Sequence, residues 1–369
     1  MKFEIQRENL LRALRIVSGG VDKKNATNSP MLSGVLLSIQ SGVLALATTD
    51  QEIEITTTAI LEKEVEPGSL VICFRKLNDI CRALPDGGIV SFKQQGDKIS
   101  VQSGRSHYSL GILSAESFPS FYRDTPIASF TASKKIFRQF IENACFAIAD
   151  QDVRLYLNGL LIEVKDKTVS AVASDGHRLA LSVLPGIEEI VDDFRVLLPK
   201  KAVLECLRVL DNAEGSVLFE VGARYFRLLT GNHQVTAHLL EAKFPEYRRL
   251  IPEARLGEMC ADKQRLKEAF NRVAALFSDR FRAVRLKLLN HKLTLTAANA
   301  ESDQVEEDLD VEYNGDAFEI VFNIKYLLDC LQAIQHNRVR FLFSGLNSSA
   351  KLQGDGCNDS LYVIMPMKF

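Results

Sequence analysis

Two pairs of side chains in this sequence have the residue types and the spacing that catalysis or metal binding would require. Asp175 and His177 are separated only by Gly176, and a carboxylate beside an imidazole is a pairing that general acid–base catalysis uses. His233 and His238 could supply two imidazole ligands to a metal ion. Both interpretations depend on the elements that carry these residues.

Those elements argue against an enzyme. The stretch around His233 and His238 alternates like a strand, so residues five apart point to opposite faces and cannot easily share an ion. The Asp-Gly-His run has no nucleophile at a recognisable position. The chain also has no P-loop, no GxGxxG run and no carboxylate cluster of the two-metal kind. We therefore expect no catalytic residue, no metal site and no cofactor.

The composition is that of a globular protein. At 369 residues the chain fits two or three domains, and 46% hydrophobic with 25% charged residues is ordinary for such folds. The first twenty residues carry charges every few positions, unlike a secretion signal, and no segment reaches membrane-spanning length. The seven cysteines are odd in number and form no CxxC pair, which is typical of a reducing cytosol. We expect a cytoplasmic protein.

The chain contains three copies of one unit. In each copy two alternating strands end at a polar residue, and a lysine that begins a helical pattern follows 26 residues later. A cysteine lies five residues beyond each lysine. These positions are Asp50, Lys76 and Cys81; Asp175, Lys201 and Cys206; and Asn299, Lys325 and Cys330. The repeat predicts three tandem domains, 1–127, 128–254 and 255–369, and only the second copy has a histidine after its polar residue.

Each copy also contains two helical patterns. Apolar residues recur at helical spacing, as at Leu10, Leu14 and Val17, whereas the remaining stretches alternate with period two. The predicted helices cover residues 7–18, 75–84, 133–145, 200–210, 262–275 and 325–336. Two helices and roughly eight strands per copy predict an α+β fold, with helices on one face of antiparallel sheets.

Charge is distributed unevenly along the chain. Five predicted helices carry +2 each and the sixth is neutral, so the helices total +10 and the rest of the chain carries −12 within a net charge of −2. If all the helices face one side, they form a positive surface that attracts phosphates without regard to base sequence. Aromatic residues on the polar helix faces are few, which disfavours single strands. Duplex DNA is the better ligand.

Over its whole length the chain resembles the beta subunit of bacterial DNA polymerase III, the sliding clamp family. Four motifs carry the resemblance: QDVRLYLNGLL at 151–161, SDGHRLA at 174–180, KFPEYRRLIP at 243–252 and YVIMPMKF at 362–369. The resemblance implies a non-enzymatic, head-to-tail homodimer that forms a ring of clamp domains around duplex DNA. It also implies that the ring gives processivity to the polymerase alpha subunit and docks the clamp loader and repair proteins.

The resemblance further implies which residues meet DNA. They are Lys23, Lys24, Arg75, Gln151, Tyr156, Lys200 and Lys201. Two local departures from the family bear on these contacts. Leu155 stands where the family usually has a second aromatic residue, and the loop 21–29 differs from the usual Gly/Arg-rich form. The tilt of DNA in the ring is therefore not carried over from the family.

The family binds short linear peptides in a hydrophobic cleft between the second and third domains. Exposed methionines suit this task because they offer adaptable apolar surface. The chain ends in Lys368 and Phe369, which is bulkier than the leucine common there and alters the rim of the cleft. The matching residues are Leu157, Ser174, Gly176, His177, Arg178, Leu179, Pro245, Arg249, Leu250, Asn323, Tyr326, Ser349, Val363, Met365, Pro366 and Met367.

Ring closure in the family pairs a sheet edge of the first domain with one of the third domain from the other subunit. The matching residues of the first domain are Lys76, Arg105, His107, Tyr108 and Leu110. Those of the third domain are Ala275, Leu276, Glu301, Asp303, Glu306 and Glu307. A basic edge facing an acidic one fixes head-to-tail polarity, because identical edges would repel.

Two other functions fit part of the sequence. A DNA-modifying enzyme with a basic groove would show metal-dependent nuclease or polymerase activity. A structural repeat protein would bind peptides but fail to hold circular DNA.

Overall fold

The computed structural model describes residues 1–22, 29–61, 65–119, 121, 124–187, 193–210, 215–253, 256–277, 282–299 and 301–367. The chain divides into two compact units. The first unit contains Met1–Lys135 and Leu204–Leu239, and the second contains Ile136–Val203 and Leu240–Phe369. The second repeat is therefore divided between the units. Part of its strands continue the sheet of the first repeat, and the others continue a sheet of the third repeat.

The described residues form six α-helices at the predicted places. They are α1 (Arg7–Val17), α2 (Phe74–Ala83), α3 (Lys134–Cys145), α4 (Lys200–Val209), α5 (Lys263–Ala274) and α6 (Ile324–Ala333). In α1 the buried residues Leu10, Ala13, Leu14 and Val17 follow the helical spacing that the sequence predicts. Helix α6 ends three residues before its predicted end, because Ile334 already has extended backbone angles.

Among the described residues, sixteen strands belong to the first and second repeats. Those of the first repeat are β1 (Lys2–Gln6), β2 (Gly34–Gln40), β3 (Val43–Thr49), β4 (Ile53–Ile60), β5 (Gly68–Cys73), β6 (Ile89–Gln95), β7 (Lys98–Ser103) and β8 (Ser106–Ser114). Those of the second are β9 (Ala128–Ser133), β10 (Gly159–Lys165), β11 (Thr168–Ser174), β12 (Arg178–Leu184), β13 (Phe194–Pro199), β14 (Ser216–Val221), β15 (Tyr225–Thr230) and β16 (His233–His238).

The third repeat contributes nine strands among the described residues. They are β17 (Gly257–Asp262), β18 (Ala283–Leu289), β19 (Lys292–Ala298), β20 (Gln304–Asp310), β21 (Glu312–Gly315), β22 (Phe318–Asn323), β23 (Arg338–Phe343), β24 (Ala350–Gly354) and β25 (Ser360–Ile364). The count of two helices and about eight strands per repeat is thus confirmed, and β21 is the one addition.

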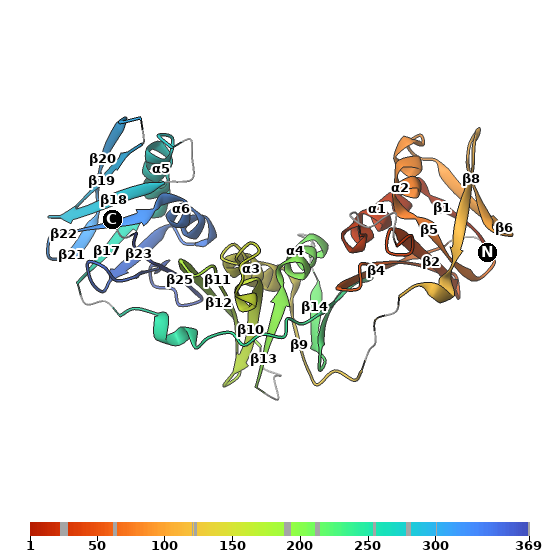
Figure 1. Ribbon diagram of the computed structural model, residues 1–369, viewed down its shortest axis with the longest axis horizontal. Coiled ribbons are helices and arrows are strands. Elements are labelled where there is room, and N and C mark those ends of the chain that lie inside the picture. The colour runs from red at the N-terminus through yellow and green to blue at the C-terminus, as the bar shows by residue number, and fades with distance from the viewer. Residues whose placement is uncertain are drawn as a thin grey trace. The chain divides into compact units, whose positions relative to one another are not determined.

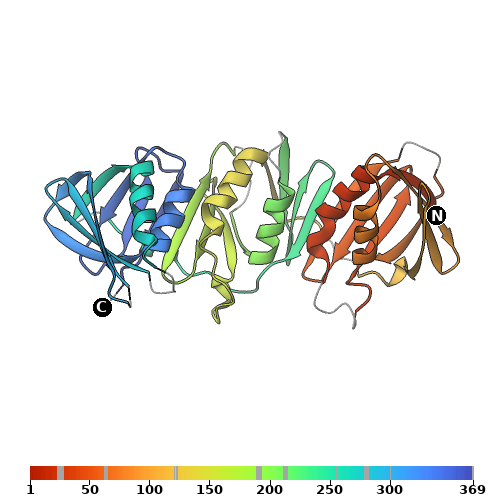
Figure 2. The same cartoon turned by 90° about the horizontal axis from the view of Figure 1, so that it is seen from above.

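The first unit is built on one 12-stranded sheet. Its order is β1-β6-β7-β8-β5-β2-β3-β4-β16-β15-β14-β9, so strands of two repeats form a continuous sheet. The repeats meet where β4 pairs with β16, in a register that runs from His233 opposite Thr57 to Ala237 opposite Ile53. Helices α1 and α2 lie side by side on one face of the sheet (Figures 1 and 2). This is the α+β arrangement that the sequence predicts.

The described part of the second unit forms two sheets. The larger has the order β13-β10-β11-β12-β25-β24-β23-β17-β21, and the smaller β20-β19-β18-β22. Second and third repeats meet where β12 pairs with β25, with Arg178 opposite Ile364 and Ser182 opposite Ser360. Helices α5 and α6 pack against each other in this unit (Figure 2). None of the described helices is long and apolar enough to cross a membrane.

The two histidines of the candidate metal pair have separate local partners. His233 Nδ1 lies 2.8 Å from the hydroxyl of Thr57, and the ring of His238 stacks on Phe121 at 4.5 Å between centroids. Among the described residues, no three His, Cys, Asp or Glu side chains are grouped as they would be around a metal ion.

The repeat of polar residues, lysines and cysteines has a structural basis. Asp50, Asp175 and Asn299 each accept a hydrogen bond at the side-chain oxygen from the backbone N–H two residues later, so each stabilises the start of the turn that follows the second strand. Cys81, Cys206 and Cys330 each lie on the buried face of the following helix. The conserved spacing within this chain therefore records one fold used three times.

Burial also protects these three thiols from reaction. It raises the pKa of Cys81 to about 12 and raises those of Cys206 and Cys330 as well. Since the thiolate is the nucleophile, we expect iodoacetamide at pH 8 to leave all three unmodified in the native protein while half-buried Cys73 reacts. Peptide mass spectrometry measures this, with urea-unfolded protein as the fully alkylated control. Native alkylation of Cys330 at the rate of Cys73 would contradict the prediction.

Candidate functional site

The first unit carries a basic groove between α1 and α2. It is a hollow of about 920 Å³ lined by Arg7, Arg15, Arg75 and Arg82, together with polar and apolar side chains such as Asn78 and Leu11. Arg7 ties the two helices together, because its Nε donates to the carbonyl of Cys81 at 2.9 Å and its guanidinium pairs with Asp86. The groove thus presents several guanidinium groups on one surface, which suits a polyanion.

Arg75 is the predicted DNA residue that this groove contains. Its side chain is 90% exposed and lies 3.8 Å from Asp79, a loose ion pair that leaves the guanidinium accessible. Arg15 and Arg82 line the same groove and are exposed. Sequence reasoning counted both in the helix charge but did not name them, because their convergence depends on how α1 packs against α2.

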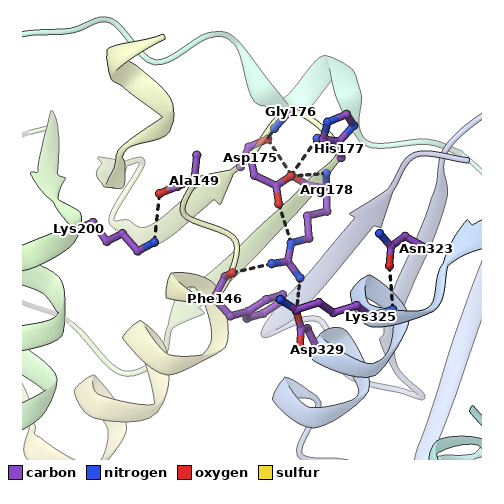
Figure 3. Close-up of polar contacts among 11 residues, drawn as sticks. Phe146, Ala149, Asp175, Gly176, His177, Arg178, Lys200, Asn323, Lys325 and Asp329 are labelled. Atoms are coloured by element: carbon purple, nitrogen blue, oxygen red, sulfur yellow. Dashed lines mark hydrogen bonds and ion pairs between the residues drawn. The ribbon is translucent and has the colours of Figure 1, made fainter. Parts of the chain in front are cut away.

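The other predicted DNA residues belong to the second unit or lie outside the described residues. Lys23 and Lys24 lie outside the described residues, as does most of the loop 21–29. Gln151 is exposed with φ at +56°, and Lys201 is exposed on α4. Lys200 donates to the carbonyl of Ala149 at 3.3 Å (Figure 3). It also pairs with Asp150 at 3.2 Å.

Tyr156 lies in an apolar environment instead. Its ring packs edge-on against Phe244 with 6.1 Å between centroids, and it is partly buried against an apolar cluster of the second unit. The neighbouring Leu155 is 62% exposed. Tyr156 therefore borders the predicted peptide cleft, and its contact with DNA stays a prediction.

Arg178 is the centre of the polar contacts in the second unit (Figure 3). Its guanidinium pairs with Asp175 at 3.0 Å and with Asp329 of α6 at 2.6 Å, and it donates to the carbonyl of Phe146 at 2.9 Å. It also lies over the rings of Tyr326 and Phe146, at 4.6 and 5.1 Å from the centroids. One side chain thus joins β12, the segment after α3, and α6.

These contacts stabilise the charged form of Arg178 and use its hydrogen-bond donors. Burial alone would lower the pKa of its guanidinium, but the carboxylates of Asp329 and Asp175 outweigh that effect and raise it. The side chain is only 8% exposed. It therefore has little surface to offer a peptide, and its place in the predicted cleft is that of a residue which positions its neighbours.

Several predicted cleft residues surround this centre. Gly176 has φ at +87° and a Cβ there would come within 2.8 Å of Arg154, so the turn requires glycine. His177 is exposed and stacks on Tyr326, with 6.4 Å between centroids and 19° between planes. The backbone N–H of Met365 donates to the carbonyl of His177 at 2.9 Å, and Ser174 Oγ to that of Arg178 at 2.8 Å.

The beginning of α6 completes this group. Asn323 caps the helix by accepting from the N–H of Lys325 at 3.0 Å (Figure 3). The N–H of Met367 donates to the carbonyl of Val321 at 2.8 Å, so the C-terminal segment runs beside β22. Pro366 lies between the two anchored methionines and is half-buried.

An apolar cluster lies next to these polar contacts. Leu179 and Val363 are cross-strand partners on β12 and β25, and both belong to it. The buried members are Leu161, Val172, Leu179, Leu181, Leu197, Phe244, Tyr247 and Val363. Met365 is 45% and Leu250 46% exposed, so apolar surface continues outward beyond the cluster. Sequence reasoning missed Phe244 and Tyr247, although the KFPEYRRLIP motif contains both.

The remaining cleft residues lie as follows. Leu157 is buried, whereas Pro245 and Arg249 are exposed on the segment that follows β16. Ser349 is half-buried, and its carbonyl accepts from the hydroxyl of Ser344 at 3.2 Å. Lys368 and Phe369 lie outside the described residues.

The predicted residues of the first-domain sheet edge lie on and beside β8. This strand pairs with β7 over Ser106–Gly111 and with β5 only over Ser114–Ile112, so one edge of its first part has no described partner strand. Tyr108 and Leu110 are half-buried, His107 is exposed, and Arg105 is exposed in the preceding turn. Lys76 is exposed on α2.

The acidic counterparts lie on and beside β20. Among the described strands β20 pairs only with β19, so its outer edge is also open. Glu306 is exposed, and Glu307 accepts from Arg272 of α5 at 2.6 Å. Asp303 accepts from the Asn299 amide at 3.0 Å, Glu301 is exposed, and Ala275 and Leu276 follow the end of α5.

Three repeats of paired helices on antiparallel sheets, with a basic groove between helices and open strand edges, define a DNA clamp. Comparisons of the sequence identify the particular family. Models of the DNA polymerase III beta subunit match in order: the N-terminal domain over residues 1–122, the central domain over 131–246 and the C-terminal domain over 248–368. The chain belongs to this family, the beta sliding clamps.

Individual relatives agree over the full length. The beta sliding clamp of Pseudomonas putida is 40% identical over 368 residues and that of Escherichia coli 37%, each comparison covering all of both chains. A crystal structure of the Pseudomonas aeruginosa sliding clamp bound to griselimycin matches with a TM-score of 0.95 and 40% identity, again covering both chains completely. The protein is a DNA sliding clamp for the replicative polymerase, and its contribution is processivity rather than catalysis.

Proposed function

We propose that two copies of this chain pair head to tail into a closed ring around duplex DNA. The observation that supports this most is the presence of two open strand edges of opposite charge. The edge of β8 has Arg105 and His107 beside it, and that of β20 carries Glu306. An edge with unpaired N–H and C=O groups is a template for another strand, and opposite charges select the unlike edge.

In the ring, DNA contact is topological with weak local attraction. Arg75 with Arg15 and Arg82, and the lysines Lys200 and Lys201, supply positive charge that binds phosphates without reading bases. Several of these cations already have carboxylate neighbours, as Lys200 has Asp150. These carboxylates reduce the net positive charge that the DNA meets. The attraction then stays weak enough for the clamp to move along the duplex.

The second unit then serves as the docking site for partner peptides. The apolar cluster around Leu179 and Val363, bordered by Met365, His177 and Leu250, offers a surface for short apolar segments. Its occupants are the polymerase alpha subunit, the clamp loader and repair proteins that carry such segments. The griselimycin complex of the related Pseudomonas aeruginosa clamp is consistent with a ligand-binding surface on this fold.

The proposal also includes the domain limits, which are 1–127, 128–254 and 255–369, and a cytoplasmic location.

Retention on circular DNA tests the ring. Protein loaded onto nicked circular DNA by a clamp loader should stay bound in high salt, and should be lost once a restriction enzyme linearises the circle. Retention on both forms would indicate ordinary binding, and loss from both would leave only a peptide-binding protein. Divalent-metal-dependent cleavage or extension of the DNA would instead support a DNA-modifying enzyme.

A further inference from the structure

A buried carboxylate holds the segment that connects the second and third repeats. Glu163 lies in the middle of β10, where it is 3% exposed among apolar neighbours. A charge at such a position is costly unless it is paired. It is paired three times, with Arg195, Arg248 and Tyr247.

Two of these partners come from the connecting segment itself. Residues 247–250 form a short 3-10 helix, and Tyr247 donates its hydroxyl to Glu163 Oε2 at 2.7 Å. Arg248 donates to the same oxygen at 2.5 Å, and its guanidinium lies 4.7 Å from the centre of the Tyr247 ring. Both bonds reach one carboxylate, so they fix where this turn sits on the sheet.

The third partner connects the carboxylate to the neighbouring strand. Arg195 of β13 is directly opposite Glu163 in the sheet and pairs with its Oε1 at 3.2 Å. It also donates to the carbonyl of Phe244, at 3.4 Å. Burial alone would raise the pKa of Glu163, but the hydrogen bonds from Arg248 and Tyr247 outweigh it and hold the pKa below its usual value.

The anchored segment supplies part of the proposed peptide site. Phe244 and Tyr247 are buried in the apolar cluster, whereas Pro245, Arg249 and Leu250 are exposed. Leu161, two residues before Glu163 on the same face of β10, belongs to the cluster as well. A shift of the turn would therefore move the exposed residues and the apolar floor together.

We propose that Glu163 is a positioning residue of the peptide site: it holds the turn at residues 247–250 so that Arg249 and Leu250 face an incoming peptide. The inference rests on the proposed docking function of this surface. Glu163 itself is too buried to touch a peptide. It acts through Tyr247 and Arg248.

The test compares Glu163→Gln with Glu220→Gln in the full-length protein. Glu220 of β14 makes a similar cross-strand pair with Arg227 and belongs to the first unit, whereas the connecting segment belongs to the second, so it controls for loss of a sheet carboxylate. The probe is a fluorescent peptide that copies the clamp-binding segment of the polymerase alpha subunit. We expect Glu163→Gln to weaken its binding ~10-fold and Glu220→Gln to leave it unchanged, because only the former loses charge-assisted bonds to the connecting segment, those from Tyr247 and Arg248.

Hydrogen exchange of residues 243–252 supplies the readout that distinguishes positioning from general stability. Faster exchange there in Glu163→Gln, with unchanged exchange in the strands, supports the proposal. Unchanged peptide affinity would overturn it, and so would weaker affinity with unchanged exchange of this segment. Tyr247→Phe, which removes only the hydroxyl, should show both effects to a smaller degree and serves if Glu163→Gln fails to fold. Absence of peptide binding by the unaltered protein would instead overturn the docking function on which the inference depends.

Discussion

Replacing Arg178 with methionine is expected to lower the free energy of unfolding of the second unit by about 3 kcal/mol. The substitution keeps most of the aliphatic volume but removes the charge that Asp175 and Asp329 share. Both carboxylates would then face a partly buried space without a cation, since they are 17% and 31% exposed. The carbonyl of Phe146 would also lose its donor.

Urea unfolding followed by fluorescence or circular dichroism measures this loss. The matched control is Arg285→Met, because Arg285 also pairs with a carboxylate, Glu319 at 3.0 Å, but both side chains are about half exposed. Exposed pairs contribute little, so this variant should lie within ~0.5 kcal/mol of the unaltered protein. Equal effects of the two substitutions would show that Arg178 is no more than a surface cation.

The sequence predicts the repeat and its elements well because both depend on local patterns. Burial at Leu10, Leu14 and Val17 follows from helical spacing, and the turns after β3 and β11 follow from the polar residues Asp50 and Asp175. The family motifs assign Leu179 and Val363 to one predicted cleft, and in the structure the two are cross-strand partners.

What the sequence does not predict depends on long-range contacts. Glu163 reads as one polar residue in an apolar strand, and nothing local indicates that Tyr247 and Arg248, more than eighty residues away, satisfy it. The sequence predicts Arg178 only as a cleft residue. Its partner Asp329 is 151 residues away, so nothing local indicates that Arg178 is buried and joins three elements of the second unit. Tyr156 similarly joins an apolar cluster that no local pattern reveals.

The two junctions between consecutive repeats have similar contacts: at each, an arginine pairs with a carboxylate and donates to a carbonyl at the end of a helix. At the first, Arg208 of α4 pairs with Glu205 and donates to carbonyls at the end of α1, including that of Ile16 at 2.5 Å. At the second, Arg178 pairs with Asp329 and donates to the carbonyl of Phe146, just after α3. Both arrangements place positive charge where a helix C-terminus carries partial negative charge.

The first repeat differs at the corresponding position. Glu205 and Asp329 each precede the repeat cysteine by one residue, and the residue there in α2 is Ile80. An interface formed by α2 would therefore have no carboxylate at this place to hold a buried arginine. In the proposed ring, the junction between subunits would depend instead on the pairing and the charges of the two strand edges, β8 and β20.

Leu110→Glu should consequently separate the proposed dimer, raising its dissociation constant at least ~100-fold, because the new charge would face the acidic edge of β20. Sedimentation velocity over a range of concentrations measures this, and retention on circular DNA should fall in parallel. Leu113→Glu is the control, since Leu113 lies on the same strand but within the part paired with β5. Leu110→Lys adds the opposite charge at the same place and should weaken the dimer less, because Glu306 can attract it. If Leu110→Glu and Leu110→Lys weaken association equally, charge does not set the polarity of the interface; if neither does, β8 is not the edge that closes the ring.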